Sequence, residues 1–152
     1  MFEAAFSRAV NRHILTSNTP NALHIFDPVS RTDQAIALSC PPVSLSLSLD
    51  GLLAVVGHDG GISAINLKLG QIVGFYPVPL DVKGLSLTPR GIVFTSPSLY
   101  VSFDRFSFLA YSRGVSVSLD LGTGRTRSLP QPIGSGGPTK LWPDGLTLYA
   151  NS

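Results

Sequence analysis

Residues 43–56 read Val-Ser-Leu-Ser-Leu-Ser-Leu-Asp-Gly-Leu-Leu-Ala-Val-Val. Leucines alternate with serines over the first half, which is the period of two expected of a strand with one buried face. Asp50-Gly51 follows and supplies the positive backbone φ that a tight turn needs. The continuous apolar run from Leu52 to Val56 then predicts a second strand that is buried on both faces.

The same strand–turn–strand segment returns twice further along the chain. Residues 83–94 read Lys-Gly-Leu-Ser-Leu-Thr-Pro-Arg-Gly-Ile-Val-Phe, and residues 139–150 read Thr-Lys-Leu-Trp-Pro-Asp-Gly-Leu-Thr-Leu-Tyr-Ala. The turn positions of the three copies are Asp50, Arg90 and Asp144, which are 40 and 54 residues apart.

A second landmark keeps step with the first. A polar residue ends an apolar strand at Asp27, Asn66 and Asp120, with intervals of 39 and 54 residues. Two landmarks that agree within one residue predict an internal repeat of about 40 residues. The longer second interval predicts an insertion, which we place near residues 97–111.

Strand–turn–strand units at this period are typical of β-propeller blades, each a four-stranded antiparallel sheet. We therefore predict an all-β fold, a partial β-propeller over residues 12–152, with residues 1–11 as an N-terminal arm. Only about three blades are present, whereas closed propellers have about four to eight. The chain is then a fragment of a longer propeller, which we favour, or a homo-oligomer that closes the ring, or an isolated arc. We expect residues 12–38 to form the end of one blade, residues 42–79 and 82–132 to form two complete blades, and residues 138–152 to start another.

The repeat resembles the YVTN-type and WD-repeat-like β-propellers, most clearly from Leu45 to Gly70 and again over residues 120–124, Asp-Leu-Gly-Thr-Gly. It departs from the WD pattern because no Trp-Asp pair closes a blade and Trp142 lies in a first strand. The resemblance implies a binding platform, or a lactonase-like or dehydrogenase-like enzyme. It carries over no catalytic residue, because the matching positions are structural.

Composition excludes several classes of protein. Charged residues make up 13% of the chain and the net charge is +2, without a basic run interleaved with aromatics, so we expect no nucleic-acid partner. The chain contains no stretch of about 18 apolar residues, so we predict no membrane span. The single cysteine, Cys40, excludes an intrachain disulfide and is expected to be a small buried or inter-blade residue rather than a nucleophile. The N-terminus lacks the pattern of a signal peptide, so the compartment stays open, although a fragment of a YVTN-type protein would be exported.

The insertion holds the candidate binding site. Residues 99–103 and 106–111 both alternate, which predicts a hairpin with Asp104-Arg105 at its tip. An aromatic hairpin that projects from a blade is a surface for a protein partner; the alternative is a pair of lengthened strands packed in the core. The residues predicted to contact a partner are Tyr100, Phe103, Asp104, Arg105, Phe106 and Phe108.

We predict no catalytic, metal-binding or cofactor-binding residue. The spacing of His13, His24 and His58 matches no metal motif, so these are expected in turns or on the surface. Residues 134–137, Gly-Ser-Gly-Gly, lack the lysine of a phosphate-binding loop, and no Gly-x-Ser-x-Gly elbow is present. The predicted function is a non-catalytic scaffold that binds a protein or ligand. The alternative is part of a propeller enzyme, a lactonase-like hydrolase or a quinone-dependent dehydrogenase.

Overall fold

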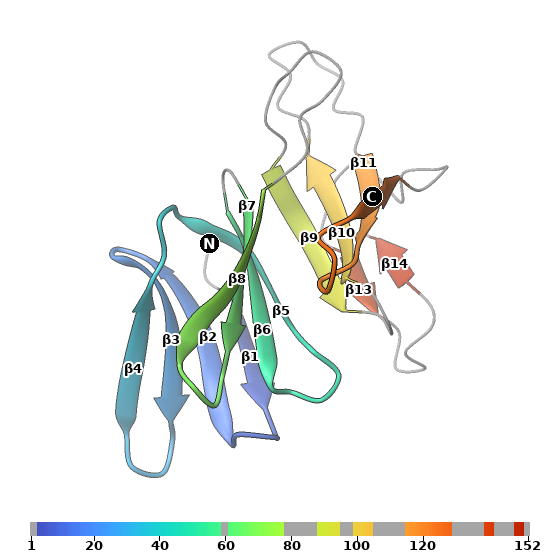
Figure 1. The fold of residues 1–152 in the computed structure, drawn as a ribbon. Coiled ribbons are helices and arrows are strands. Elements are labelled where there is room, and N and C mark those ends of the chain that lie inside the picture. The colour runs from blue at the N-terminus through green and yellow to red at the C-terminus, as the bar shows by residue number, and fades with distance from the viewer. Residues whose placement is uncertain are drawn as a thin grey trace.

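The structure is a computed structural model whose regular elements, within the residues that it describes, are all β-strands (Figure 1). In this part of the chain no helix is long and apolar enough to cross a membrane. The backbone is described for residues 3–58, 61–77, 88–94, 99–104, 115–128, 139–141 and 148–150, and the side chains for residues 3–58, 61–77 and 119–127.

In the part of the chain that the structure describes, the strands form three four-stranded sheets and one strand pair, and within each sheet the strands pair antiparallel in sequence order. The first sheet holds β1 (Ala4–Ser7), β2 (Arg12–Asn18), β3 (Asn21–Asp27) and β4 (Thr32–Ala37). The second sheet holds β5 (Pro42–Leu47), β6 (Leu53–His58), β7 (Gly61–Asn66) and β8 (Gln71–Pro77). The third sheet holds β9 (Thr88–Phe94), β10 (Leu99–Asp104), β11 (Val115–Leu119) and β12 (Thr126–Ser128), and the final pair is β13 (Thr139–Leu141) and β14 (Leu148–Ala150).

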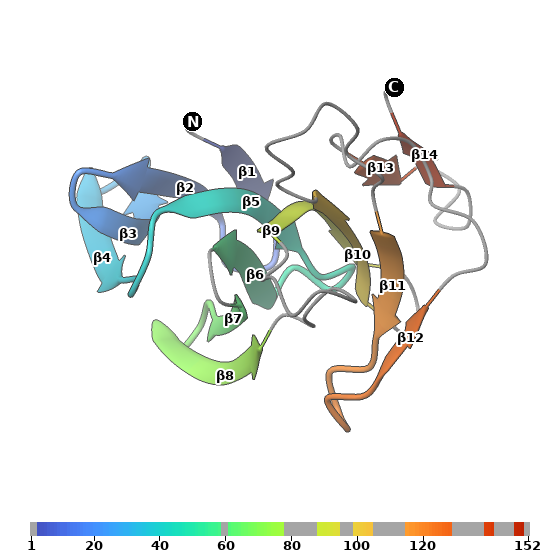
Figure 2. The ribbon, with the colours of Figure 1, turned by 90° about the horizontal axis from the view of Figure 1, so that it is seen from above.

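The four sheets spread like a fan from their first strands (Figure 2). β5 contacts β1 and β9, and β9 contacts β13, so the first strands lie together at the centre of the fan. The Glu3 carboxylate, at the start of β1, accepts a 2.5 Å hydrogen bond from the amide of Leu45 in β5. Sheets that radiate from adjacent inner strands have the arrangement of propeller blades around a common axis.

Among the side chains that the structure describes, a buried hydrophobic cluster lies between the first and second sheets. Ile14 and Leu23 from the first sheet and Val56 and Ile65 from the second are fully buried in one cluster. The opposite face of the second sheet is also covered, since Val55 is 0% exposed. The prediction that this strand is buried on both faces is therefore confirmed.

The first sheet begins earlier than the sequence predicted. Residues 1–11 were expected to form an arm outside the blades, yet Ala4–Ser7 pairs with β2 and completes a four-stranded sheet. The backbone of Glu3 extends this pairing, because its carbonyl accepts a hydrogen bond from the amide of Thr16. The strand escaped the repeat comparison because its short sequence, Ala-Ala-Phe-Ser, has no serine–leucine alternation. Residues 12–38 thus hold three strands of a complete blade rather than the end of one.

The polar landmark at the end of the third strand is confirmed in all three sheets. Asp27 Oδ1 accepts hydrogen bonds from the amides of Val29 and Ser30. The side-chain oxygens of Asn66 and Asp120 accept the same two bonds in the second and third sheets. A short polar side chain that bonds the backbone two and three residues ahead closes a tight turn.

These turns share a second property at the position four residues after the polar landmark. Arg31, Gly70 and Gly124 all have a positive φ, of 58°, 64° and 72°. Glycine adopts this conformation without penalty. The turn of the first sheet has Arg31 where the other two turns have glycine. The repeat is therefore preserved in backbone conformation even where its residue type differs.

The other landmark is only partly right. Gly51, after Asp50, has a φ of 72°, as a turn glycine should. Arg90, however, lies inside strand β9 and not in a turn. The Arg90-Gly91 pair resembles Asp-Gly in sequence, but β9 is joined to β10 by residues 95–98.

The extra residues of the third repeat are divided between two connections. The connection between β8 and β9, which joins the second sheet to the third, runs over residues 78–87. The equivalent connection between the first and second sheets runs only over residues 38–41. The connection between β10 and β11 runs over residues 105–114. The equivalent connection in the second sheet, between β6 and β7, runs only over residues 59–60. The single insertion predicted near residues 97–111 is thus replaced by two longer connections at the same end of the third sheet.

Candidate functional site

One face of the first sheet is not covered by the second. Successive residues of a strand point to opposite faces, and Ile14 and Leu23 mark the face in the core. We call the opposite side the open face. Its aromatic and alanine positions include Phe6, which is 44% exposed, and Ala35, which is exposed. By strand register the open face holds Ala4, Phe6, His13, Leu15, Ser17, Ala22, His24, Phe26, Asp33, Ala35 and Ala37.

A pocket of about 390 Å³ lies on the open face. It extends from Glu3 at the start of β1, past Leu15 and Ser17 in β2, to His24 in β3 and Asp33 in β4. The exposed surface inside it is mainly apolar. An apolar pocket with a few convergent polar groups is the usual form of a binding site.

The polar groups of the pocket form a chain of hydrogen bonds. Ser17 Oγ lies 2.9 Å from His24 Nε2, and His24 Nδ1 lies 2.7 Å from Asp33 Oδ2. Serine, histidine and aspartate joined in this order have the connectivity of a hydrolytic triad. Sequence patterns do not reveal this chain of hydrogen bonds, because Ser17 and Asp33 belong to no known motif and the three residues lie on three strands.

The serine hydroxyl is engaged in another direction. Ser17 Oγ donates a 2.7 Å hydrogen bond to the carbonyl oxygen of Pro20. A serine has one hydroxyl hydrogen. While that hydrogen is bonded to Pro20, the lone pairs of Ser17 face His24, which reverses the bond that a general base makes with its nucleophile.

The second sheet repeats this polar pair in exchanged positions. His58 Nε2 lies 2.8 Å from Ser63 Oγ. Leu15 pairs with His24 as Val56 pairs with Ser63, so His58 occupies the position of Ser17 and Ser63 that of His24. A histidine–serine pair on the second and third strands is therefore a feature of the blade face and is not peculiar to the pocket.

His58 corrects one prediction. It was expected in a turn, but it is the last residue of β6 and only 1% exposed. Its ring stacks on Phe75 with a centroid distance of 6.0 Å. The buried strand β6 continues through Gly57 and ends at His58. Only two residues connect it to β7, so His58 belongs to the strand and not to the turn.

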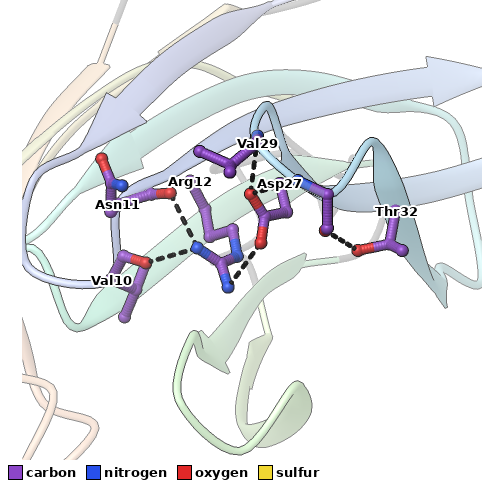
Figure 3. A network of polar contacts seen from close by, with 7 residues as sticks. Val10, Asn11, Arg12, Asp27, Val29 and Thr32 are labelled. Atoms are coloured by element: carbon purple, nitrogen blue, oxygen red, sulfur yellow. Dashed lines mark hydrogen bonds and ion pairs between the residues drawn. The ribbon is translucent and has the colours of Figure 1, made fainter.

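The other polar groups of the first sheet serve its turns (Figure 3). Arg12 Nη1 donates to the carbonyl oxygens of Val10 and Asn11, at 3.1 and 2.9 Å, and Arg12 Nη2 lies 2.9 Å from Asp27 Oδ2. The hydrogen bond from the Val29 amide, aided by the charge of Arg12, lowers the pKa of the Asp27 carboxyl. These contacts clamp the β1–β2 turn to the β3–β4 turn.

A similar effect acts in the turn of the second sheet. The hydroxyl of Ser48 and then the amide of Leu52 donate hydrogen bonds to Asp50 and lower the pKa of its carboxyl. Asp27 and Asp50 are thus ionised groups held by local donors. In the part of the chain that the structure describes, no three His, Cys, Asp or Glu side chains gather closely enough to hold a metal ion.

The hairpin predicted as a partner-binding site is built differently. Residues 99–103 pair with Val115–Leu119 on one side and with β9 on the other, and not with residues 106–111. The predicted pairing of residues 99–103 with residues 106–111 is therefore wrong. Tyr100, Phe103 and Asp104 lie within β10, whereas Arg105, Phe106 and Phe108 lie outside the described residues. Partner binding by these residues stays a prediction.

The remaining candidates are placed as follows. His13 lies on the open face with its ring 5.0 Å from that of Phe6, and His24 lies in the middle of β3 and not in a turn. Cys40 is half-buried in the connection between the first two sheets, which agrees with an inter-blade position. The segment at 134–137 lies outside the described residues.

Comparison with known proteins places the fold. No family model matches the chain, and no curated protein sequence does. Among solved structures, hydrazine synthase from Kuenenia stuttgartiensis matches 95% of this chain and 40% of its own, with a TM-score of 0.71 and 16% identity. The dihydro-heme d1 dehydrogenase NirN, solved in complex with DHE, matches 84% of this chain and 36% of its own, with a TM-score of 0.55 and 15% identity. Both are β-propeller proteins.

This chain is a partial β-propeller. The predicted fold class, with four-stranded antiparallel blades, is confirmed. The tricorn protease is also similar, over 84% of this chain and 12% of its own, with a TM-score of 0.53 and 11% identity. The propeller thus spans well under half of the length of each structure that it matches, and at such identities the likeness shows the fold alone.

Proposed function

We propose that this propeller segment is a non-catalytic scaffold that binds a protein or ligand through the open face of its first blade. The observation that carries the proposal is the exposure of that face. It presents an apolar pocket of about 390 Å³ and the 44% exposed ring of Phe6. Contiguous apolar surface on one sheet face marks an interaction site. We also propose that the repeat is of the YVTN or WD-like type, on the strength of its Asp-Gly turn and its Asp or Asn turn closure.

The polar residues that recur in the repeat support a structural role. Asp27, Asn66 and Asp120 each close a turn, and His58 and Ser63 are buried against each other. Groups that satisfy backbone amides or one another are committed to the fold. The regular positions of the blades therefore supply stability, and binding is left to the exposed surface.

A second candidate function rests on one specific observation. The Ser17–His24–Asp33 chain has the connectivity of a hydrolase site beside an apolar pocket. It supports the alternative in which this segment belongs to a hydrolytic propeller enzyme. The bond from Ser17 to Pro20 and the matching pair in the second sheet favour the scaffold.

A serine-directed fluorophosphonate probe separates the two functions. The whole chain is incubated with the probe and digested, and the peptide that carries Ser17 is examined by mass spectrometry. We expect no adduct on Ser17, because its hydroxyl is bonded to Pro20 and is not activated by His24. An adduct that disappears in both His24→Ala and Asp33→Asn would overturn the scaffold and establish the hydrolase. Lys68→Ala, an exposed change in the second-sheet turn, is the matched control.

A further inference from the structure

We propose that the turn end of the blades binds the surface of a membrane that contains anionic lipids. The turn end is the end of the antiparallel strands where the chain reverses in short turns (Figure 1). It consists of residues 8–11, 28–31, 48–52, 67–70 and 120–125. This surface is distinct from the open face, and the inference does not need the scaffold function proposed for that face.

Apolar side chains are exposed at three of these turns. Val29 is 81% exposed, Leu49 is 64% exposed and Leu69 is 61% exposed. Leu49 and Leu69 keep this exposure although the first blade packs against the second, because the two blades meet through the faces of their sheets. Any blade that packs on a sheet face leaves the turn end exposed in the same way.

The turns hold two of these side chains in fixed positions. Asp27 Oδ1 accepts a 2.9 Å hydrogen bond from the amide of Val29, and Asn66 Oδ1 accepts a 3.0 Å hydrogen bond from the amide of Leu69. The polar residue that closes each turn therefore also fixes the backbone of its apolar tip. In the third sheet the amides bonded in this way belong to a glycine and a threonine, so the apolar tips come from the first two sheets.

Cationic side chains accompany the apolar tips. Among the side chains that the structure describes, every lysine and arginine lies in one of these turns or within two residues of one: Arg8, Arg12, Arg31, Lys68, Arg125 and Arg127. Arg12 pairs with Asp27, and the other five form no ion pair with a described side chain. These five charges are therefore available to an anionic surface.

The carboxylates near the turn end are engaged locally. Asp33 Oδ2 lies 2.7 Å from His24 Nδ1. Asp50 and Asp120 accept hydrogen bonds from donors of their own turns. Within the five turns four cations outnumber two acids, which leaves two positive charges in excess. The charge of the turn end thus complements an anionic partner.

The spacing of the apolar tips favours a lipid surface over a protein or a nucleic acid. The tips stand singly on separate turns, and Lys68 is adjacent to Leu69 while Arg31 is two residues from Val29. A protein partner is bound mainly through a clustered apolar centre that fits a pocket, and phosphate contacts to a nucleic acid make no use of aliphatic tips. The boundary between headgroups and acyl chains accepts separate apolar side chains and attracts the cations beside them.

Co-sedimentation of the whole chain with vesicles tests the proposal. We expect binding to equimolar phosphatidylcholine and phosphatidylserine that weakens at high salt, and at least tenfold weaker binding to phosphatidylcholine alone. Lys68→Gln should weaken binding to the anionic vesicles about fivefold. Ser39→Glu makes the same change of net charge in an exposed connection at the opposite end of the blades, and should alter binding less than about twofold.

A second pair of variants tests the apolar tips without a change of charge. Leu69→Ser removes an apolar tip and should weaken binding about tenfold. Val73→Ser is the matched control, because Val73 is an apolar residue of the same sheet that is 54% exposed but lies in β8 and not in a turn. We expect it to alter binding less than about twofold. Both variants should keep the far-ultraviolet dichroism spectrum of the wild type.

Several outcomes would overturn the proposal. One is a wild-type chain that does not bind the anionic vesicles, and another is an equal loss for the two members of either pair of variants. Stronger binding to polyglutamate or to duplex DNA than to the vesicles, lost in Lys68→Gln, would identify the partner as an acidic protein or a nucleic acid. That result would likewise reject a membrane as the occupant of the turn end.

Discussion

The packing of the first blade on the second predicts a large effect of truncating Ile65. This side chain is 0% exposed and lies in the cluster that joins the two sheets. Ile65→Ala removes three carbon atoms, worth about 0.8 kcal/mol each by transfer. The cavity that is left adds to this loss. We expect the free energy of unfolding to fall by about 3 kcal/mol, a large part of the ~5–15 kcal/mol typical of a folded domain.

The chain offers a matched control directly across the sheet. Ile72 in β8 is the register partner of Ile65, but it is 46% exposed. Ile72→Ala removes the same atoms from a half-solvated site, so we expect a loss below about 1 kcal/mol. Urea unfolding followed by far-ultraviolet dichroism measures both. Equal losses for the two variants, or a loss below about 1 kcal/mol for Ile65→Ala, would refute the inter-blade core.

Four further substitutions probe other parts of the fold. Tyr76→Phe removes the 2.7 Å hydrogen bond from the Tyr76 hydroxyl to the carbonyl of Leu121, which joins the second and third sheets, and should cost about 1 kcal/mol in urea unfolding. Gly124→Ala should cost about 1 kcal/mol because φ is positive there, whereas Arg31→Gly at the equivalent turn position should stabilise the chain by a similar amount; the same sign for both in thermal melts would contradict the shared turn conformation. The lowered pKa of Asp27 means that its contribution to stability is present above its ordinary value of about 3.9 and is lost as the pH falls below it. Asp27→Asn keeps the turn oxygen and removes the charge, so its melting temperature should fall less than that of the wild type between about pH 5 and pH 3; parallel curves would argue against a pKa of Asp27 lowered by the Val29 amide and the other local donors.

The architecture could be predicted from the sequence wherever local pattern and fold agree. The alternation before Asp50 and the apolar run after it gave the two strands of the second blade, and the polar landmarks gave the turns of all three sheets. These signals depend on short-range physics: the two-residue period of a strand, and a side chain that bonds amides two or three residues ahead.

The failures have the opposite origin. β1 is four residues long and becomes a strand because β2 lies beside it, which no local pattern reveals. β10 pairs with Val115–Leu119 across a ten-residue connection, while the nearer segment alternates just as well. The Ser17–His24–Asp33 chain needs the register of three strands, so it could be found only after the pairing was known.

The two ends of the blades differ in a way that bears on engineering. At one end lie the turns at residues 8–11, 28–31, 48–52, 67–70 and 120–125, all of nearly constant length. At the other end the connections vary from residues 59–60 to residues 78–87 and 105–114 without any change in strand order. Foreign peptides should therefore be accepted between β6 and β7, where the third repeat already carries a longer segment, and refused at the turns that Asp27, Asn66 and Asp120 close. The fold thus offers insertion sites at the end of the blades where connection length varies, while the turns at the other end hold the strands in register.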